Sequence, residues 1–258
     1  MPSCPIVVIA READRADTRG VSVRSRRRKR TLQVLALWGV IAFACVAPLA
    51  QTAPTDAEGV EAASEALWDA LASGDAERLH AAIQQGADVQ SAQPDGRTAL
   101  YSAVERGSLG LARELLRAGA ARDPRTANGE TLLHAAALSA DPALVDFVCE
   151  LGVSPAEANS NGETPIFWAA GGHDEAVVRR LIAHGAAVSA RNQWGQTPLH
   201  YAAASGDPEV IALLLANGAD AAARDEAGRT PKDVARERGH EAAAALLSPR
   251  CASSSSPC

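Results

Sequence analysis

Histidine and cysteine are the side chains of this sequence most able to do chemistry, as metal ligands, general acids and bases, or nucleophiles. The six histidines are His80, His134, His173, His184, His200 and His240, and the five cysteines are Cys4, Cys45, Cys149, Cys251 and Cys258. No two cysteines have the Cys-x-x-Cys spacing of a zinc site, and no Ser/His/acid, Cys/His or paired-carboxylate arrangement is evident. We therefore expect no metal, no cofactor and no catalytic residues, and predict that the protein is not an enzyme.

The elements that position these side chains follow an internal period of 33 residues. The period is set by a row of equivalent threonines, which are Thr98, Thr131, Thr164, Thr197 and Thr230. A glycine lies two residues before each threonine, and a second series of glycines runs with the same period from Gly86 to Gly218. Three independent series with one period indicate a chain built of repeated structural units.

Each unit reads as two short helices joined by turns. The threonine hydroxyl is suited to cap the first helix, and proline follows three of the threonines at the first helical position. Apolar residues spaced three and four apart, such as Leu144, Val145 and Val148, place one face of the second helix against neighbours. Because the chain is 47% hydrophobic but only 3% aromatic, small aliphatic side chains must do most of the packing. No unit can bury this face alone, so the units must stack.

The threonine series carries a recognisable motif. Residues 197–202 read TPLHYA, and residues 131–136 and 164–169 read TLLHAA and TPIFWA. These segments resemble the T-P-L-H-x-A signature of the ankyrin repeat. The resemblance implies an all-α solenoid of stacked helix-turn-helix units with hairpin-like loops. It also implies that His134 and His200 brace their turns by hydrogen bonds, and Cys149 aligns with buried apolar positions of other units.

The resemblance divides the chain into segments. We predict an N-terminal basic region with a signal peptide or membrane anchor (1–50), a linker (51–59), an ankyrin-repeat domain (60–248) and a disordered serine-rich tail (249–258). Within the domain we expect a degenerate cap (60–92), four full repeats (93–224) and a C-terminal cap (225–248), because end units need polar outer faces. Cys251 and Cys258 fall in the tail, where an oxidising compartment could pair them.

The N-terminal region has the layout of an export signal. A basic cluster, RRRKR at residues 26–30, precedes an apolar run at residues 32–49. The pattern leaves three alternatives open: cleavage before Cys45 or Gln51, attachment of a lipid at Cys45, or retention as an anchor. We predict a periplasmic or secreted protein, or one anchored at the inner membrane. A bacterial origin is expected from this signal-like start and because usage that is rich in Ala and Arg and poor in Lys is typical of GC-rich genomes.

The distribution of charge excludes some partners. Residues 1–30 hold nine basic and three acidic side chains, so the rest of the chain holds 16 basic and 28 acidic ones. An acidic body is repelled by phosphate backbones and by anionic lipid surfaces. We therefore expect no nucleic acid partner, and contact with a membrane only through the N-terminal segment.

The resemblance to ankyrin repeats implies a concave groove, formed by the hairpin tips and the first helices, that binds another protein. We predict a monomeric, non-catalytic interaction scaffold with one unidentified protein partner; an effector or regulatory subunit and a self-associating structural protein are the alternatives. The candidate binding residues are Asp95, Arg97, Glu105, Arg106, Asn128, Glu130, Asn161, Glu163, Gln193, Trp194, Gln196 and Arg229.

Trp194 is the most distinctive of these candidates. Its position in the repeat otherwise holds Asp95, Asn128, Asn161 and Ala227, so core packing does not explain a tryptophan there. We expect an exposed indole at a hairpin tip, beside Gln193 and Gln196, that anchors the interface. We also expect it to face the same way as the charged side chains of Glu163 and Arg229. The alternative is an indole that folds back on its own hairpin.

Overall fold

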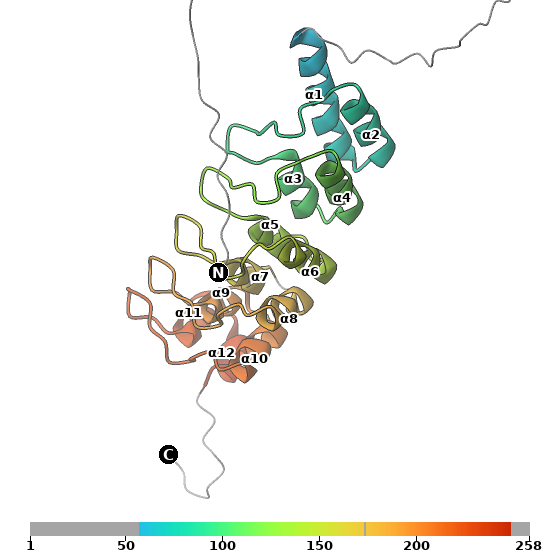
Figure 1. Cartoon of the computed structure of the whole chain (residues 1–258). Helices are drawn as coiled ribbons and strands as arrows, with labels where there is room; N and C mark the ends of the chain where they lie inside the picture. The colour runs from blue at the N-terminus through green and yellow to red at the C-terminus, as the bar shows by residue number, and fades with distance from the viewer. Residues whose placement is uncertain (1–56, 173, 249–258) are drawn as a thin grey trace, which may run out of the picture. The chain divides into compact units, whose positions relative to one another are not determined.

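The computed structural model describes residues 57–172 and 174–248. These residues form helices joined by turns and loops, with one isolated bridge between Ala92 and Thr98 in place of a sheet. The all-α solenoid expected from the sequence is confirmed (Figure 1). The predicted export signal, the possible lipid attachment at Cys45 and the serine-rich tail lie outside the described residues. Within the described part of the chain, no helix is long and apolar enough to cross a membrane.

The helices form two rows, and the long loops project from the row that we call the inner row (Figure 1). The inner row contains α1 (Ala57–Ser73), α3 (Ala99–Glu105), α5 (Leu132–Leu138), α7 (Pro165–Gly171), α9 (Pro198–Ser205) and α11 (Pro231–Glu237). The outer row contains α2 (Ala76–Gln84), α4 (Leu109–Arg117), α6 (Pro142–Glu150), α8 (Glu175–Ala183), α10 (Pro208–Ala216) and α12 (Glu241–Leu246).

The core runs continuously through the stack. Each inner helix from α3 to α9 contacts the next inner helix, and each helix of the outer row from α6 to α10 contacts the next outer one. The apolar face of the outer row is buried, as at Leu144, Val145 and Val148, and so are paired alanines of the inner row such as Ala169 and Ala170. Alanine brings the helices close, which explains how a chain with few aromatic residues fills its core.

The equivalent threonines begin the inner helices, but they cap them in different ways. The hydroxyl of Thr98 accepts a hydrogen bond from the N–H of Tyr101 at 3.3 Å. Thr131 and Thr197 instead form capping boxes with a histidine three residues later. In the unit of Thr164 that histidine is replaced by Phe167, and the buried hydroxyl of Thr164 has no hydrogen-bond partner among the described residues.

One segment boundary and the burial of one residue differ from what the sequence predicted. The linker predicted for residues 51–59 ends too late, because helix α1 already begins at Ala57. Cys149 is only partly buried, although its register predicted a core position. Burial and, to a smaller extent, the carboxylate of Asp146 raise the pKa of the Cys149 thiol to about 11, so it is a weak nucleophile at neutral pH.

Candidate protein-binding surface

The hairpin tips are joined into a continuous strip by backbone hydrogen bonds between successive units. The carbonyl oxygens of Asp95, Asn128, Asn161 and Trp194 each accept from the tip of the next unit, at distances of 2.8, 2.8, 2.9 and 3.0 Å. These four carbonyls belong to the position in the repeat that Trp194 shares. The tips are therefore held in register with one another and present their side chains from a rigid strip.

Each of the last four tips is also braced by a short polar side chain, which sequence reasoning missed. Asn159 and Asn192 are buried, and their side-chain oxygens accept hydrogen bonds from backbone N–H groups of their own turns. Thr126 and Asp225 occupy the same position in the repeat and accept from the N–H of Glu130 and Arg229. The signal was present in the sequence as Thr, Asn, Asn and Asp at intervals of 33 residues.

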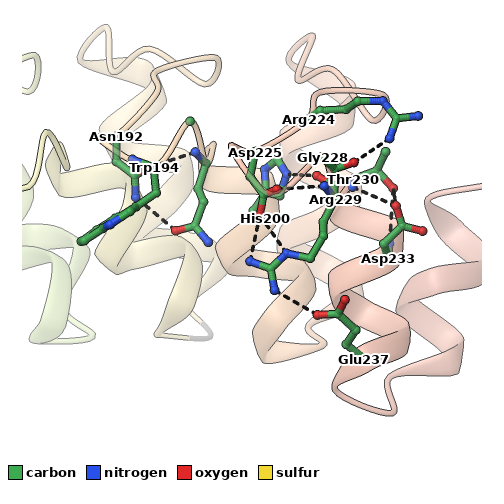
Figure 2. Close-up of polar contacts among 12 residues, drawn as sticks. Asn192, Trp194, His200, Arg224, Asp225, Gly228, Arg229, Thr230, Asp233 and Glu237 are labelled. Atoms are coloured by element: carbon green, nitrogen blue, oxygen red, sulfur yellow. Dashed lines mark hydrogen bonds and ion pairs between the residues drawn. The ribbon is translucent and has the colours of Figure 1, made fainter.

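Trp194 lies exposed at its tip, as predicted, with 43% of its surface accessible. Its backbone N–H donates to the side-chain oxygen of Asn192 at 3.1 Å, which fixes the backbone that carries the indole (Figure 2). A hollow of about 480 Å³ lies beside it, and Gln196, Glu226 and Arg229 contribute to the lining. The tryptophan is therefore a large apolar group presented to solvent on a braced turn.

Glu163 contradicts the prediction of an exposed tip charge. It is only 7% accessible, and its carboxylate accepts hydrogen bonds from Asn159 Nδ2 at 3.1 Å, from Trp168 Nε1 at 3.1 Å and from the hydroxyl of Tyr201. Its charge therefore does not face the same solvent as Trp194. Sequence reasoning failed here because the residue that covers the carboxylate, Tyr201, belongs to the next unit.

The protonation states in this cluster follow from its contacts. Burial alone would raise the pKa of Glu163, but the hydrogen bonds from Tyr201, Asn159 and Trp168 outweigh burial and lower the pKa. Burial and the neighbouring carboxylate raise the pKa of the Tyr201 phenol. The cluster is therefore an ionised carboxylate that holds two aromatic side chains in place through their donors.

Two of the candidate arginines are engaged within their own units, at opposite ends of the stack. Arg97 lies 3.1 Å from Asp95 and 3.0 Å from Glu105. Arg229 lies 2.8 Å from Asp225 and 3.0 Å from Glu237 (Figure 2). Such partly exposed pairs contribute little to stability, but they orient both side chains.

The side chains of the remaining candidate residues differ in their hydrogen bonds and exposure. Glu130 is partly buried and accepts hydrogen bonds from Thr126 Oγ1 at 2.9 Å and from the Tyr101 hydroxyl at 3.3 Å. Gln193 donates to the Asn161 side chain at 3.3 Å, and Gln196 accepts from Asn192 at 3.2 Å. Arg106 donates to the Ala72 carbonyl at 3.3 Å, and the side chain of Asn128 is exposed.

A second exposed apolar residue and a second hollow lie on the inner row. Leu138, at the end of α5, is 48% accessible. A hollow of about 510 Å³ is lined by residues of α7, α9 and α11 and of the turns before the last two, among them Gly171, Tyr201, Ala204, Arg229 and Arg238. We call the tips together with this side of the inner row the inner face.

The histidines have structural contacts. The Nδ1 atoms of His134 and His200 lie 3.0 and 2.9 Å from the hydroxyl oxygens of Thr131 and Thr197, so both rings brace their own turns as the resemblance implied. In addition, His134 Nε2 lies 2.9 Å from the carbonyl oxygen of Glu163, and His200 Nε2 lies 3.1 Å from that of Arg229, so both rings also bridge neighbouring units. Burial lowers the pKa of both rings, which keeps them neutral. Over residues 57–172 and 174–248, no three His, Cys, Asp or Glu side chains are grouped as metal ligands. His173 lies outside these ranges.

Comparison with protein families gives a match that covers most of the chain. A family model described as ankyrin repeats (3 copies) matches residues 67–159, 143–225 and 191–254, which together make up well over half of the chain. No curated protein matches the sequence. Ankyrin repeats generally mediate protein–protein interaction. The repeat period, the braced hairpin tips, the bridging histidines and this match agree, and the chain belongs to the ankyrin-repeat family.

Proposed function

We propose that this protein is a non-catalytic scaffold that binds one protein partner on its inner face. The observation that carries the proposal is Trp194, an exposed indole on a tip that Asn192 braces and that hydrogen bonds connect to the neighbouring tips. Interfaces concentrate their binding energy in a few large side chains, and tryptophan is among the commonest. A rigid tip loses little entropy on binding, so more of the contact energy contributes to affinity.

The surroundings of Trp194 are consistent with an interface. The adjoining hollow provides concave surface beside the indole, and Glu226 and Gln196 give it a polar rim. The indole and Leu138 are the exposed large apolar side chains of the described residues, and both belong to the inner face. A partner covering this face would bury both, which gives it an apolar centre with polar edges.

The partner is best sought with the full-length protein as bait. Three baits are compared: the unaltered chain, Trp194→Ala, and Glu150→Ala, which changes an exposed residue of α6 in the outer row, away from the inner face. We expect a protein that the first and third baits retain and that Trp194→Ala loses, with binding about 2 kcal/mol weaker in a titration. Equal retention by all three baits would reject the inner face around Trp194 as the binding site.

We further propose that the protein acts outside the cytoplasm, in the bacterial periplasm or anchored to the inner membrane. The support is the basic cluster at residues 26–30 followed by the apolar run at 32–49. Residues 1–60 are fused to a reporter that is active only after export. We expect activity, and a soluble, inactive fusion in the cytosol would reject export. Mass spectrometry of the mature protein distinguishes cleavage, lipid attachment and an uncut anchor.

We propose that the scaffold works as a monomer, with self-association as the competing function. Self-association is considered because Trp194 and Leu138 are both exposed on one molecule. Size-exclusion chromatography with light scattering is expected to give the mass of one chain. A dimer that dissociates in Trp194→Ala would instead identify a second copy as the partner.

A further inference from the structure

Two positions, eight residues apart, recur in each repeat on the inner face. The first is the residue before the capping threonine, which we call the turn position, and it holds Arg97, Glu130, Glu163, Gln196 and Arg229 in successive units. The second lies eight residues later, near the end of the inner helix, which we call the helix position, and it holds Glu105, Leu138, Gly171, Ala204 and Glu237. The same two positions thus vary in charge along the stack.

In the two outermost of these units, the fold fills both positions with opposite charges. Arg97 Nη1 lies 3.0 Å from Glu105, and Arg229 Nη1 lies 3.0 Å from Glu237. The guanidinium of Arg97 also lies 5.8 Å from the centre of the Tyr101 ring, which is a cation–π distance. These pairs show that a side chain at one position reaches the other, and in the unit of Arg97 an aromatic ring also lies beside the cation.

The central unit has an acid at the turn position and no side chain at the helix position. Glu163 has no basic partner within residues 57–172 and 174–248, and its three hydrogen bonds all come from neutral donors. Opposite it, Gly171 ends helix α7 with an ordinary helical backbone. A Cβ built on Gly171 would have only Tyr201 Cδ1 near it, at 3.7 Å, so the space above this glycine is open.

We infer that the inner face binds an arginine or lysine side chain of its partner over Gly171, against the Tyr201 ring and close to the Glu163 carboxylate. The arrangement would reproduce, with a base supplied by the partner, the ion pair that both outer units make for themselves and the aromatic contact that the unit of Arg97 makes. The inference rests on the proposed function, because the subsite lies on the same inner face.

The surroundings of Gly171 favour a cation at this end of the hollow. Tyr201 donates its hydroxyl hydrogen to Glu163, and this bond increases the electron density of the ring that a cation would contact. The cationic residues of the hollow, Arg229 and Arg238, belong to its other end, and Arg229 is already paired with Asp225 and Glu237. A buried carboxylate acts strongly on a nearby cation because little water screens it.

The subsite can be tested on the full-length protein without knowing the partner. The probe is N-acetyl-arginine amide, and its control is the citrulline analogue, which has nearly the same shape but no charge. Binding is followed by NMR at the indole N–H signal of Trp168, which is hydrogen-bonded to Glu163. We expect a saturable shift with the arginine probe and at least about tenfold weaker binding of the citrulline probe.

Three variants assign the binding to these residues. Glu163→Gln keeps the size of the side chain and removes the charge, and we expect about tenfold weaker binding of the arginine probe. Gly171→Lys fills the site with a base from the chain itself and should abolish binding even if Glu163→Gln fails to fold. Its matched control is Gly110→Lys, at a helical glycine of α4 with no atom within 4 Å of an added Cβ, which should bind normally.

The possible outcomes separate this inference from the proposed function. Equal shifts with the two probes, no shift at Trp168, or normal binding in Gly171→Lys would overturn the cation subsite. None of these results would affect a partner that is retained by the unaltered chain and lost by Trp194→Ala. Conversely, a saturable, charge-dependent shift would stand even if Trp194→Ala retained the partner, in which case the tip assignment alone would fall.

Discussion

The turns at residues 159–164 and 192–197 are braced by the same backbone hydrogen bonds, but the most distinctive side chain of the first is buried and that of the second is exposed. In both, a buried asparagine accepts hydrogen bonds from two N–H groups of the turn. In the first turn Glu163 is buried under Tyr201, whereas in the second Trp194 stands exposed. The two residues occupy different positions of the turn. The position of Trp194, which Asn161 holds in the first turn, is exposed in both turns, whereas the position of Glu163 is buried in the first turn and only partly buried at Gln196 in the second. Burial at the Glu163 position therefore depends on the neighbouring unit, which supplies Tyr201.

The two turns also differ in their roles. The first turn is a structural junction, because Glu163 joins residues of two units through Asn159, Trp168 and Tyr201. The second turn is the one proposed to bind a partner, because its largest side chain makes no polar contact with the neighbouring unit among the residues that the structure describes. Substitutions in the first turn should therefore change stability, and those in the second should change binding.

The largest loss of stability is expected from a core substitution in the central unit. Leu181 is fully buried in α8, and Leu181→Ala removes packing between neighbouring units. We expect a loss of about 2–5 kcal/mol in the free energy of unfolding, measured by urea denaturation. A matched control is Leu138→Ala, which truncates an exposed leucine and should cost far less. A similar loss in both variants would contradict the assigned register.

The next largest effect is expected within the first turn. Glu163→Ala leaves the donors of Asn159, Trp168 and Tyr201 without their acceptor, and we expect a loss of about 1–3 kcal/mol in the free energy of unfolding. The matched change in the second turn is Gln196→Ala, which removes one hydrogen bond with Asn192 and should cost less. Urea denaturation of both variants decides, and the reverse order would break the comparison.

A smaller effect should be shared by the two turns. Burial lowers the pKa of His134 and of His200, so the unfolded chain binds protons more readily than the folded one. Their contribution is fully present above the ordinary histidine pKa of about 6.5 and is lost as the pH falls below it. We expect unfolding to become easier between pH 7 and pH 5, where the lowered pKa of Glu163 adds nothing until still lower pH.

The histidine origin of this effect can be checked with one variant. His200→Gln removes one of the two titrating rings, and its free energy of unfolding should depend less on pH over that interval. His80→Gln is the control, because His80 is exposed and pairs with Glu114 on the outer row. An unchanged pH dependence in His200→Gln would show that other groups cause it.

The smallest effect on stability is expected at Trp194. Its indole is exposed, so Trp194→Ala should change the free energy of unfolding by less than about 0.5 kcal/mol. The same variant should lose the partner retained by the unaltered chain. A clear loss of stability with intact partner binding would make Trp194 a structural residue and remove the contrast between the two turns.

Much of the fold could be predicted from the sequence because each unit needs the same residue types at the same positions. Threonine caps, buried apolar pairs and the histidine bridges recur at fixed intervals, and the structure places Thr131, His134 and Leu144 as expected. The start of α1 was misplaced because the first unit lacks the turn motif. Local pattern is sufficient where every unit meets the same neighbours.

Predictability was poorer for the side chains of the inner face. The exposure of Trp194 followed from its tip position alone, since no other unit covers it. The burial of Glu163 depends on Tyr201, 38 residues later, and on the coincidence of Trp168 in the same unit. Such contacts depend on which residues happen to meet between units, and a 33-residue period does not encode them.

The contrast between the two turns can be tested most directly by hydrogen exchange of the tryptophan indole N–H groups, measured by NMR and assigned with Trp168→Phe and Trp194→Phe. The N–H of Trp168 donates to the buried carboxylate of Glu163, whereas Trp194 is exposed. We predict that the Trp168 indole exchanges at least about tenfold more slowly than that of Trp194, because exchange requires the hydrogen bond to open. Equal rates, or slower exchange at Trp194, would contradict this account of the two turns.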